Sequence, residues 1–65
     1  MDMKNINTFI YTAELGSFTK AAELLGYSQS TVSFQIRQLE EELGTVLFER
    51  INRTVTLTDR GKEIL

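Results

Sequence analysis

A chain of 65 residues, of which 42% are hydrophobic and 25% charged, fits one small folded domain and is too short for the large core and deep cleft of most enzymes. It contains no cysteine, no histidine and no apolar run long enough for a membrane span or signal peptide, so we expect a cytoplasmic protein that is not an enzyme and holds no cofactor or metal. The net charge of -2 would argue against a nucleic-acid partner if the acidic residues were evenly spread along the chain. They are not, because residues 24–39 and residues 50–58 contain no carboxylate and are free to face phosphate.

The first predicted helix begins after Asp2, a candidate N-cap, and ends at Gly16, because glycine readily adopts the left-handed conformation that closes a helix. Its apolar residues recur at steps of three and four, so they share one side of the helix, which we expect to face the core. These residues are Met3, Ile6, Phe9, Ile10 and Ala13.

The second and third predicted helices are joined by a very short turn. Ser17 can cap the second helix, which ends at Gly26. Ser28 can cap the third helix, which ends at Gly44. The apolar side of the second helix contains Phe18, Ala21, Ala22 and Leu25, and that of the third contains Val32, Ile36, Leu39 and Leu43. The alanines let another helix approach closely, and two helices joined by so short a turn are typical of a helix-turn-helix motif, here over about residues 18–37.

Beyond Gly44 the sequence favours strands instead of helices. Leu47–Arg50 and Thr54–Leu57 are short runs of strand-preferring residues, and Ile51–Arg53 can form the tight connection between them. This pattern predicts a two-stranded hairpin, or wing, over about residues 46–57.

A fourth helix is predicted to begin after Thr58, a candidate N-cap. Ile64 and Leu65 are apolar residues at its open end, so we expect the sequence to be the start of a longer protein. The expected fold is mainly α: a winged helix-turn-helix with three helices, a two-stranded wing and the start of a fourth helix. We assign residues 1–58 to the winged helix-turn-helix domain and residues 59–65 to the truncated fourth helix.

The outward side of the third helix is the candidate functional surface. At 100° per residue, Ser33, Phe34 and Arg37 point away from the core side that contains Val32. The full set of candidate residues is Ser28, Gln29, Ser30, Thr31, Ser33, Phe34 and Arg37. Glutamine can pair with adenine, serine and threonine with bases or phosphate, arginine with guanine or phosphate, and an aromatic ring can contact a thymine methyl group. Such a surface suits the base edges of a DNA major groove.

Simpler interpretations of these residues stay open. Ser28 serves as a helix cap whether or not it meets a ligand. The hydroxyl groups of Ser30, Thr31 and Ser33 lower the helix propensity and are not explained by capping. Phe34 has the alternative of packing against a neighbouring helix.

Two arginines flank the predicted tip of the wing. The guanidinium groups of Arg50 and Arg53 can bind phosphate or enter the narrow minor groove, and the alternative for each is a solvated surface charge. Glu40, Glu41 and Glu42 are not a converging acid cluster, because successive residues of a helix point 100° apart. We expect them to form a solvated face beyond the candidate surface.

Short motifs run through the whole chain in a characteristic order. They are Gly16–Ala22, Ser28–Gln29, Val32–Ile36, Leu39–Gly44, Leu47–Arg50, Arg53, Leu57–Thr58 and Gly61. In this order and spacing, the sequence resembles the N-terminal DNA-binding domain of the LysR-type transcriptional regulators of bacteria. The resemblance implies sequence-specific binding of double-stranded DNA. The residues that it assigns to this role are Gln29, Ser30, Thr31, Ser33 and Phe34 for base reading, Arg37 at a flanking position, and Arg50 and Arg53 in the wing.

The resemblance also implies parts that lie outside this chain. These are a complete linker helix from about Thr58, which forms a homodimer or higher homo-oligomer, and a C-terminal domain that binds a small-molecule effector; no membrane partner is implied. The sequence departs from the family's pattern at two places. Ser30–Thr31 stand where the family usually has proline followed by a small residue, and Phe34 stands where it usually has arginine or lysine. Both departures bear on base preference and affinity, since the missing cation removes a phosphate or guanine contact.

A winged helix used for protein–protein contact is the main alternative. In that interpretation Phe34 anchors a partner protein, and the acidic balance of the chain repels nucleic acid. Salt distinguishes the two functions, because phosphate binding weakens steeply as the salt concentration rises.

Overall fold

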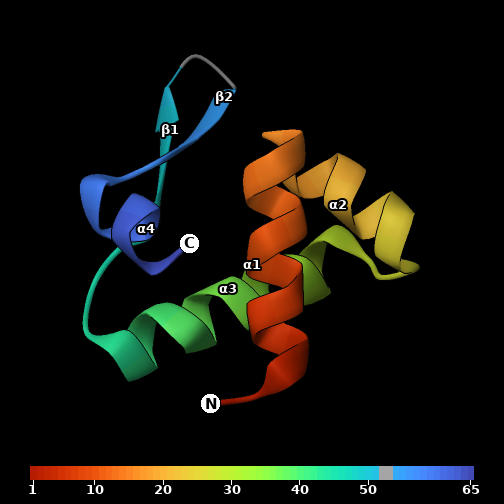
Figure 1. The fold of residues 1–65 in the computed structure, drawn as a ribbon. Helices are drawn as coiled ribbons and strands as arrows, with labels where there is room; N and C mark the ends of the chain where they lie inside the picture. Colours follow the sequence, from red (N-terminus) through yellow and green to blue (C-terminus); the bar gives the residue numbers. More distant parts are fainter. Residues whose placement is uncertain (52–53) are drawn as a thin grey trace.

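The computed structural model describes residues 1–51 and 54–65 of the chain. The elements of this part are α1 Met3–Leu15, α2 Phe18–Leu25, α3 Gln29–Leu43, β1 Phe48–Ile51, β2 Thr54–Leu57 and α4 Asp59–Ile64. Helices α1, α2 and α3 pack against one another, and the hairpin stands beside them (Figure 1). The two strands pair antiparallel, with Phe48 opposite Leu57 and Ile51 opposite Thr54. This is a winged helix-turn-helix, as the sequence predicts.

The helix boundaries are set by caps at the predicted positions. The side chains that accept a hydrogen bond from a backbone N–H in the first turn of their helices are those of Asp2, Ser17, Ser28 and Thr58. The glycines that end α1, α2 and α3 with positive φ are Gly16, Gly26 and Gly44. At Gly16 φ is 64°, a left-handed conformation that other residues adopt only at a steric cost, and its N–H closes the helix on the carbonyl oxygen of Thr12.

The core lies where the three long helices meet the hairpin. Its buried residues are Phe9, Phe18, Ala22, Val32, Ile36, Leu39, Leu47 and Phe48. The ring centre of Phe48, on β1, is 5.4 Å from that of Phe9 and 5.8 Å from that of Phe18, so aromatic contacts hold the hairpin on the helices. Ala21 and Ala22 are almost completely buried, which confirms the predicted inward side of α2.

Helix α1 forms where the sequence predicts it, but the predicted buried side is wrong in part. Phe9 is buried, whereas Met3 is 75% exposed and Ile10 is at the border of exposure. The other buried residues of α1 are polar: Asn5, Thr8 and Thr12. The side of α1 that packs against α3 therefore contains these polar residues and not Met3 or Ile10.

Hydrogen bonds explain why polar residues are buried between α1 and α3. Thr8 Oγ1 donates to Oε1 of the buried Gln35 at 2.6 Å. Asn5 Nδ2 donates to Gln38 Oε1 at 3.0 Å, and Thr12 Oγ1 donates to the carbonyl oxygen of Thr8 at 2.7 Å. Because each buried side chain finds a partner, its desolvation is largely offset, and the paired groups hold α3 in one position against α1.

Backbone and side-chain contacts attach the wing and α4 to the helices. Glu40 Oε2 accepts a hydrogen bond from the N–H of Leu47 at 2.8 Å, so Glu40 is not part of a purely solvated face, which corrects the prediction from the sequence. Thr58 Oγ1 donates to the carbonyl oxygen of Val46 at 2.7 Å. At Gly61 an added Cβ would lie 2.5 Å from the carbonyl oxygen of Leu47, so α4 approaches the chain too closely for any side chain there.

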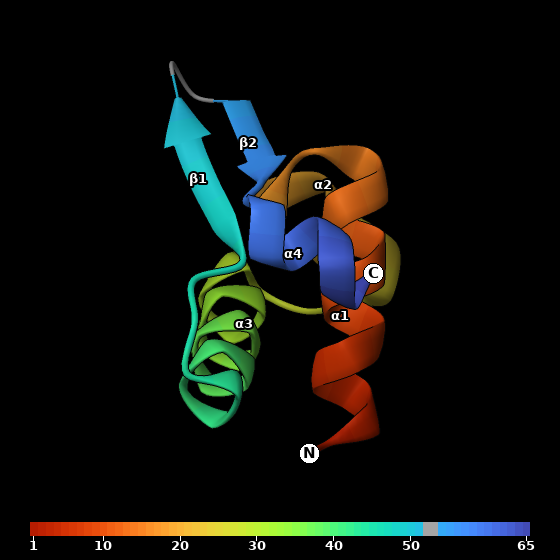
Figure 2. The same cartoon turned by 60° about the vertical axis from the view of Figure 1, so that its left-hand side comes forward.

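In the view of Figure 2, α3 and β1 lie on the left of the molecule, and α1 packs against α3 from the right. Within residues 1–51 and 54–65, none of the helices has the length and hydropathy of a membrane span.

Candidate nucleic-acid interface

The outward side of α3 is exposed as the helical period predicts. Val32 and Ile36 are buried, whereas Phe34, on another side of the helix, is 60% exposed. Of the predicted site residues on or before α3, those that are exposed are Ser28, Gln29, Ser30, Phe34 and Arg37, and those that are half-buried are Thr31 and Ser33. The predicted orientation of α3 about its axis is therefore confirmed.

The hydroxyl group of Ser28 caps the start of α3, and the hydroxyl group of Thr31 bonds to it. Ser28 Oγ accepts a hydrogen bond from the N–H of Thr31 at 3.1 Å, and the two hydroxyl oxygens share a second hydrogen bond at 2.9 Å. The Ser28 hydroxyl is therefore the N-cap, and the Thr31 hydroxyl bonds this cap without itself accepting a backbone N–H. The side chains of Gln29, Ser30 and Ser33 make no hydrogen bond to other described residues, so their polar groups are open to a ligand.

The ring of Phe34 is not packed into the fold. It borders an open hollow, and the residues that line this hollow are Gln29, Ser30, Ser33, Phe34, Arg37 and Arg50. We call these six residues the α3–β1 surface. The alternative that Phe34 packs against a neighbouring helix of its own chain is wrong, because most of the residue is in contact with solvent.

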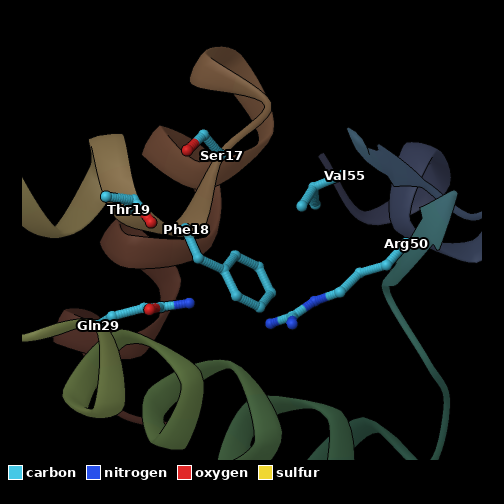
Figure 3. Close-up of a pocket in the computed structure, with 6 residues that line it drawn as sticks. All are labelled: Ser17, Phe18, Thr19, Gln29, Arg50 and Val55. Carbon is cyan, nitrogen blue, oxygen red and sulfur yellow. The ribbon is translucent and has the colours of Figure 1, made fainter. Parts of the chain in front are cut away.

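Arg50 reaches the α3–β1 surface from the wing. It lies on β1 opposite Val55 of β2, and its guanidinium carbon is 4.4 Å from the centre of the Phe18 ring. Figure 3 shows the side chain extending from β1 toward Phe18 on α2, with Gln29 of α3 beside the same pocket. The guanidinium is thus directed back toward the helices and not outward from the wing. Arg53, the other arginine predicted for the wing, lies outside the described residues.

The start of α2 contributes residues that sequence reasoning did not assign to the site. Ser17, Phe18 and Thr19 line the pocket that also contains Gln29 and Arg50 (Figure 3). Helix starts present N–H groups without intrahelical partners together with the positive end of the helix dipole, which favours anions. The sequence held one signal for this region, since the capped start of α2 opens the helix-turn-helix motif.

The α3–β1 surface contains two guanidinium groups and no carboxylate. The ion pairs among the described residues are those of the Met1 amino group with Glu42 at 3.4 Å and of Arg60 with Glu63 at 3.6 Å. Neither pair involves Arg37 or Arg50, so within the described part of the chain both charges lack a carboxylate partner. A polyanion placed on this surface meets two cations and no acidic side chain.

Comparison with known proteins identifies the family that carries this arrangement. The sequence model of the family described as "Bacterial regulatory helix-turn-helix protein, lysR family" matches residues 3–62. The chain belongs to the LysR family. The matched range runs from the start of α1 into α4, and it confirms the resemblance seen in the sequence.

LysR-family relatives with similar sequences are much longer proteins. The uncharacterized HTH-type transcriptional regulator YwqM of Bacillus subtilis is 50% identical over 62 residues, which are 95% of this chain and 21% of that protein. The HTH-type transcriptional regulator IlvY of Escherichia coli is 48% identical over 64 residues, which are 98% of this chain and 22% of that protein. This chain therefore spans about a fifth of the length of these relatives.

Solved structures of LysR-family proteins share the fold. The crystal structure of the CbnR_DBD-DNA complex matches with a TM-score of 0.94 and 38% identity, over 100% of this chain and 75% of that one. The crystal structure of the BenM_DBD/catB site 1 DNA complex matches with a TM-score of 0.93 and 42% identity, over 98% of this chain and 72% of that one. Both of these proteins were crystallised with DNA.

Proposed function

We propose that this chain binds double-stranded DNA in a sequence-specific manner, as the DNA-binding part of a bacterial transcriptional regulator that acts in the cytoplasm. The observation that carries the proposal is the α3–β1 surface, in which exposed polar side chains at the start of α3 lie beside two guanidinium groups and no carboxylate. An α-helix fits the major groove of B-DNA, and the outward side of α3 is exposed for such an approach. The CbnR and BenM complexes with DNA support the same function.

In this proposal the first half of α3 reads base edges. Gln29 offers an amide that can pair with adenine, and Ser30 and Ser33 are small enough to let the helix approach the bases. The ring of Phe34 offers an apolar surface to a thymine methyl group. These side chains would determine which sequence is bound.

Other residues of the proposed site bind the phosphate backbone of the DNA and thereby position α3 in the groove. Arg37 lies further along α3 and reaches phosphate at the edge of the groove, and Arg50 contacts the DNA backbone beside the start of α3. Arg53 contacts the DNA backbone or the flanking minor groove from the wing. Ser28, which caps α3, and Thr31, whose hydroxyl bonds to it, would lie close to the DNA backbone that flanks the groove. Such contacts contribute affinity and are largely independent of sequence.

We infer that the complete regulator is a homodimer or higher homo-oligomer. Residues 1–58 would form its DNA-binding domain, residues 59–65 would begin a dimerising linker helix, and a C-terminal domain would bind a small-molecule effector. The much greater length of the relatives supports these further parts. Two copies of α3 would then enter successive major grooves of a dyad-symmetric site, about 34 Å apart, and the effector would change their spacing or angle.

The exposure of Phe34 also supports a second candidate function, a winged helix that docks a partner protein through this ring. Such docking does not release the condensed ions of DNA, so it lacks the steep salt dependence of phosphate binding.

A salt titration of the 65-residue chain with a fluorescently labelled duplex tests the proposal. Affinity is expected to fall steeply with salt, and Arg53→Ala is expected to weaken binding to all duplexes about equally and to flatten the slope of log affinity against log salt by about 0.9 for one lost phosphate contact. Lys62→Ala, at an exposed position of α4, is the control and should leave the slope unchanged. Salt-independent binding would contradict DNA binding, and an unchanged slope in Arg53→Ala would contradict the role of that arginine.

A further inference from the structure

We propose that Phe18 is a positioning residue for DNA binding, whose ring holds the Arg50 guanidinium beside the start of α3 so that its N–H groups meet a backbone phosphate. This inference rests on the proposed DNA-binding function and adds a residue that does not itself touch DNA. Phe18 would act entirely through Arg50.

The geometry of the pair is that of a cation on an aromatic face. The guanidinium carbon of Arg50 lies 4.4 Å from the centre of the Phe18 ring, well within the roughly 6 Å over which the ring's negative face attracts a cation. Figure 3 shows the guanidinium next to the ring, at the end of a side chain that crosses the pocket from β1 to α2. The contact thus joins the wing to the helix-turn-helix.

The Phe18 ring is fixed by packing, whereas the Arg50 side chain is exposed and flexible. Phe18 is 9% exposed, and its ring packs against Phe48 with centres 5.8 Å apart and planes at 82°. Arg50 is an exposed strand residue with a long side chain, and no carboxylate of the described residues pairs with it. The cation–π contact with the Phe18 ring therefore restricts this side chain before DNA arrives.

A cation–π contact suits a phosphate contact because it is made without a hydrogen-bond acceptor, and the guanidinium has five N–H donors to offer a phosphate. Those groups lie in a pocket that Gln29, at the start of α3, also lines. Restricting a flexible side chain in its binding orientation reduces the entropy lost on binding, so the contact with Phe18 should strengthen the DNA contact.

Fluorinated phenylalanine at position 18 tests the proposal without removing the ring. Pentafluorophenylalanine has a similar shape and a reversed charge distribution on its face, so it abolishes the attraction for a cation. The substitution is made in the chain with Arg50 and in Arg50→Gln, and binding of a labelled duplex of mixed sequence is measured as a double-mutant cycle. With Arg50 we expect an affinity loss of about threefold, and in Arg50→Gln we expect none.

Two measurements guard against an effect on folding. The same replacement at Phe9, a buried ring that also packs against Phe48, is the matched control and should leave DNA affinity unchanged. The Arg50 Nε–H resonance of the free protein should carry a ring-current shift that the fluorinated ring alters. If the pentafluoro variant does not fold, 4-fluorophenylalanine provides a smaller change, for which we expect a partial loss of affinity that again requires Arg50.

Equal losses with Arg50 and with Arg50→Gln would overturn the inference, because Phe18 would then act through the fold alone. A gain in affinity on fluorination would overturn it as well, because the ring would then withhold Arg50 from DNA. In either case an unsubstituted chain that binds DNA leaves the proposed function standing. An unsubstituted chain without salt-dependent binding would remove the proposed function itself, whatever the fluorinated variants do.

Discussion

Truncation of Phe34 distinguishes a recognition residue from a core residue. Phe34 is 60% exposed, so about 40% of it is covered; for an aromatic residue of roughly 200 Å² this is about 80 Å², or at most about 2 kcal/mol at 25 cal/mol per Å². The higher helix propensity of alanine offsets about 0.5 kcal/mol of this loss, and the alanine Cβ still buries part of the area. We therefore expect Phe34→Ala to lower the free energy of unfolding by about 1 kcal/mol. Phe9→Ala, at a residue that is 2% exposed, should cost about 3–5 kcal/mol.

The same truncation should change which sequences are bound. A contact between the ring and a thymine methyl group is worth about 1 kcal/mol, or about fivefold in affinity at one base pair. Duplexes are first selected from a random pool with the unsubstituted chain, and each thymine is then replaced by uracil, which lacks the methyl group. One replacement should weaken binding about fivefold with Phe34 present and have no effect on Phe34→Ala.

Phe34→Arg should have a different effect from Phe34→Ala. It introduces a cation at the position where the LysR family usually has one, so it should raise affinity for unrelated duplexes and steepen the salt slope by about 0.9 while weakening the original base preference. Thermal melts and bound-sequence profiles of both variants check these outcomes. A Phe34→Ala protein that melts as low as Phe9→Ala and keeps its sequence profile would refute the reasoning, because the ring would then belong to the core.

Three further substitutions test the packing that holds the site. Ala22→Leu should destabilise the domain by about 1–3 kcal/mol through overpacking, and coincident melts of the variant and the original chain would show that this position tolerates bulk. Gly61→Ala should also lower the melting temperature, despite the better helix propensity of alanine, because its Cβ would meet the carbonyl oxygen of Leu47; a higher melting temperature would contradict the close approach. Thr8→Val should cost about 1–3 kcal/mol in urea unfolding by leaving Gln35 Oε1 unpaired, and adding Gln35→Met should recover part of it, whereas a double variant less stable than Thr8→Val would argue against this account.

Much of this fold is determined by short-range signals that can be read along the chain. The ends of the helices were predicted because a cap such as Ser28 or a stop such as Gly44 acts on backbone groups only a few residues away. The orientation of α3 was predicted for a similar reason: its strong apolar period allows only one buried side, which leaves Phe34 exposed. The exposed side of α3, which carries the candidate residues, was accordingly predicted correctly.

What the sequence alone did not predict depends on partners that are distant along the chain. Apolar periodicity placed Met3 and Ile10 on the buried side of α1, but both are exposed. The side that is buried contains polar groups that find partners on α3, as Thr8 does with Gln35, 27 residues away. The contribution of α2 to the site was missed because the ring that meets Arg50 lies on another element, and no local rule connects them. Hydrophobic periodicity and capping are properties of single segments, so the sequence determined the elements and the exposed side of α3. Buried polar pairs and the contact of the Arg50 guanidinium with the Phe18 ring exist only once the tertiary structure brings two segments together. The tertiary structure therefore decided which polar groups are buried and where Arg50 points.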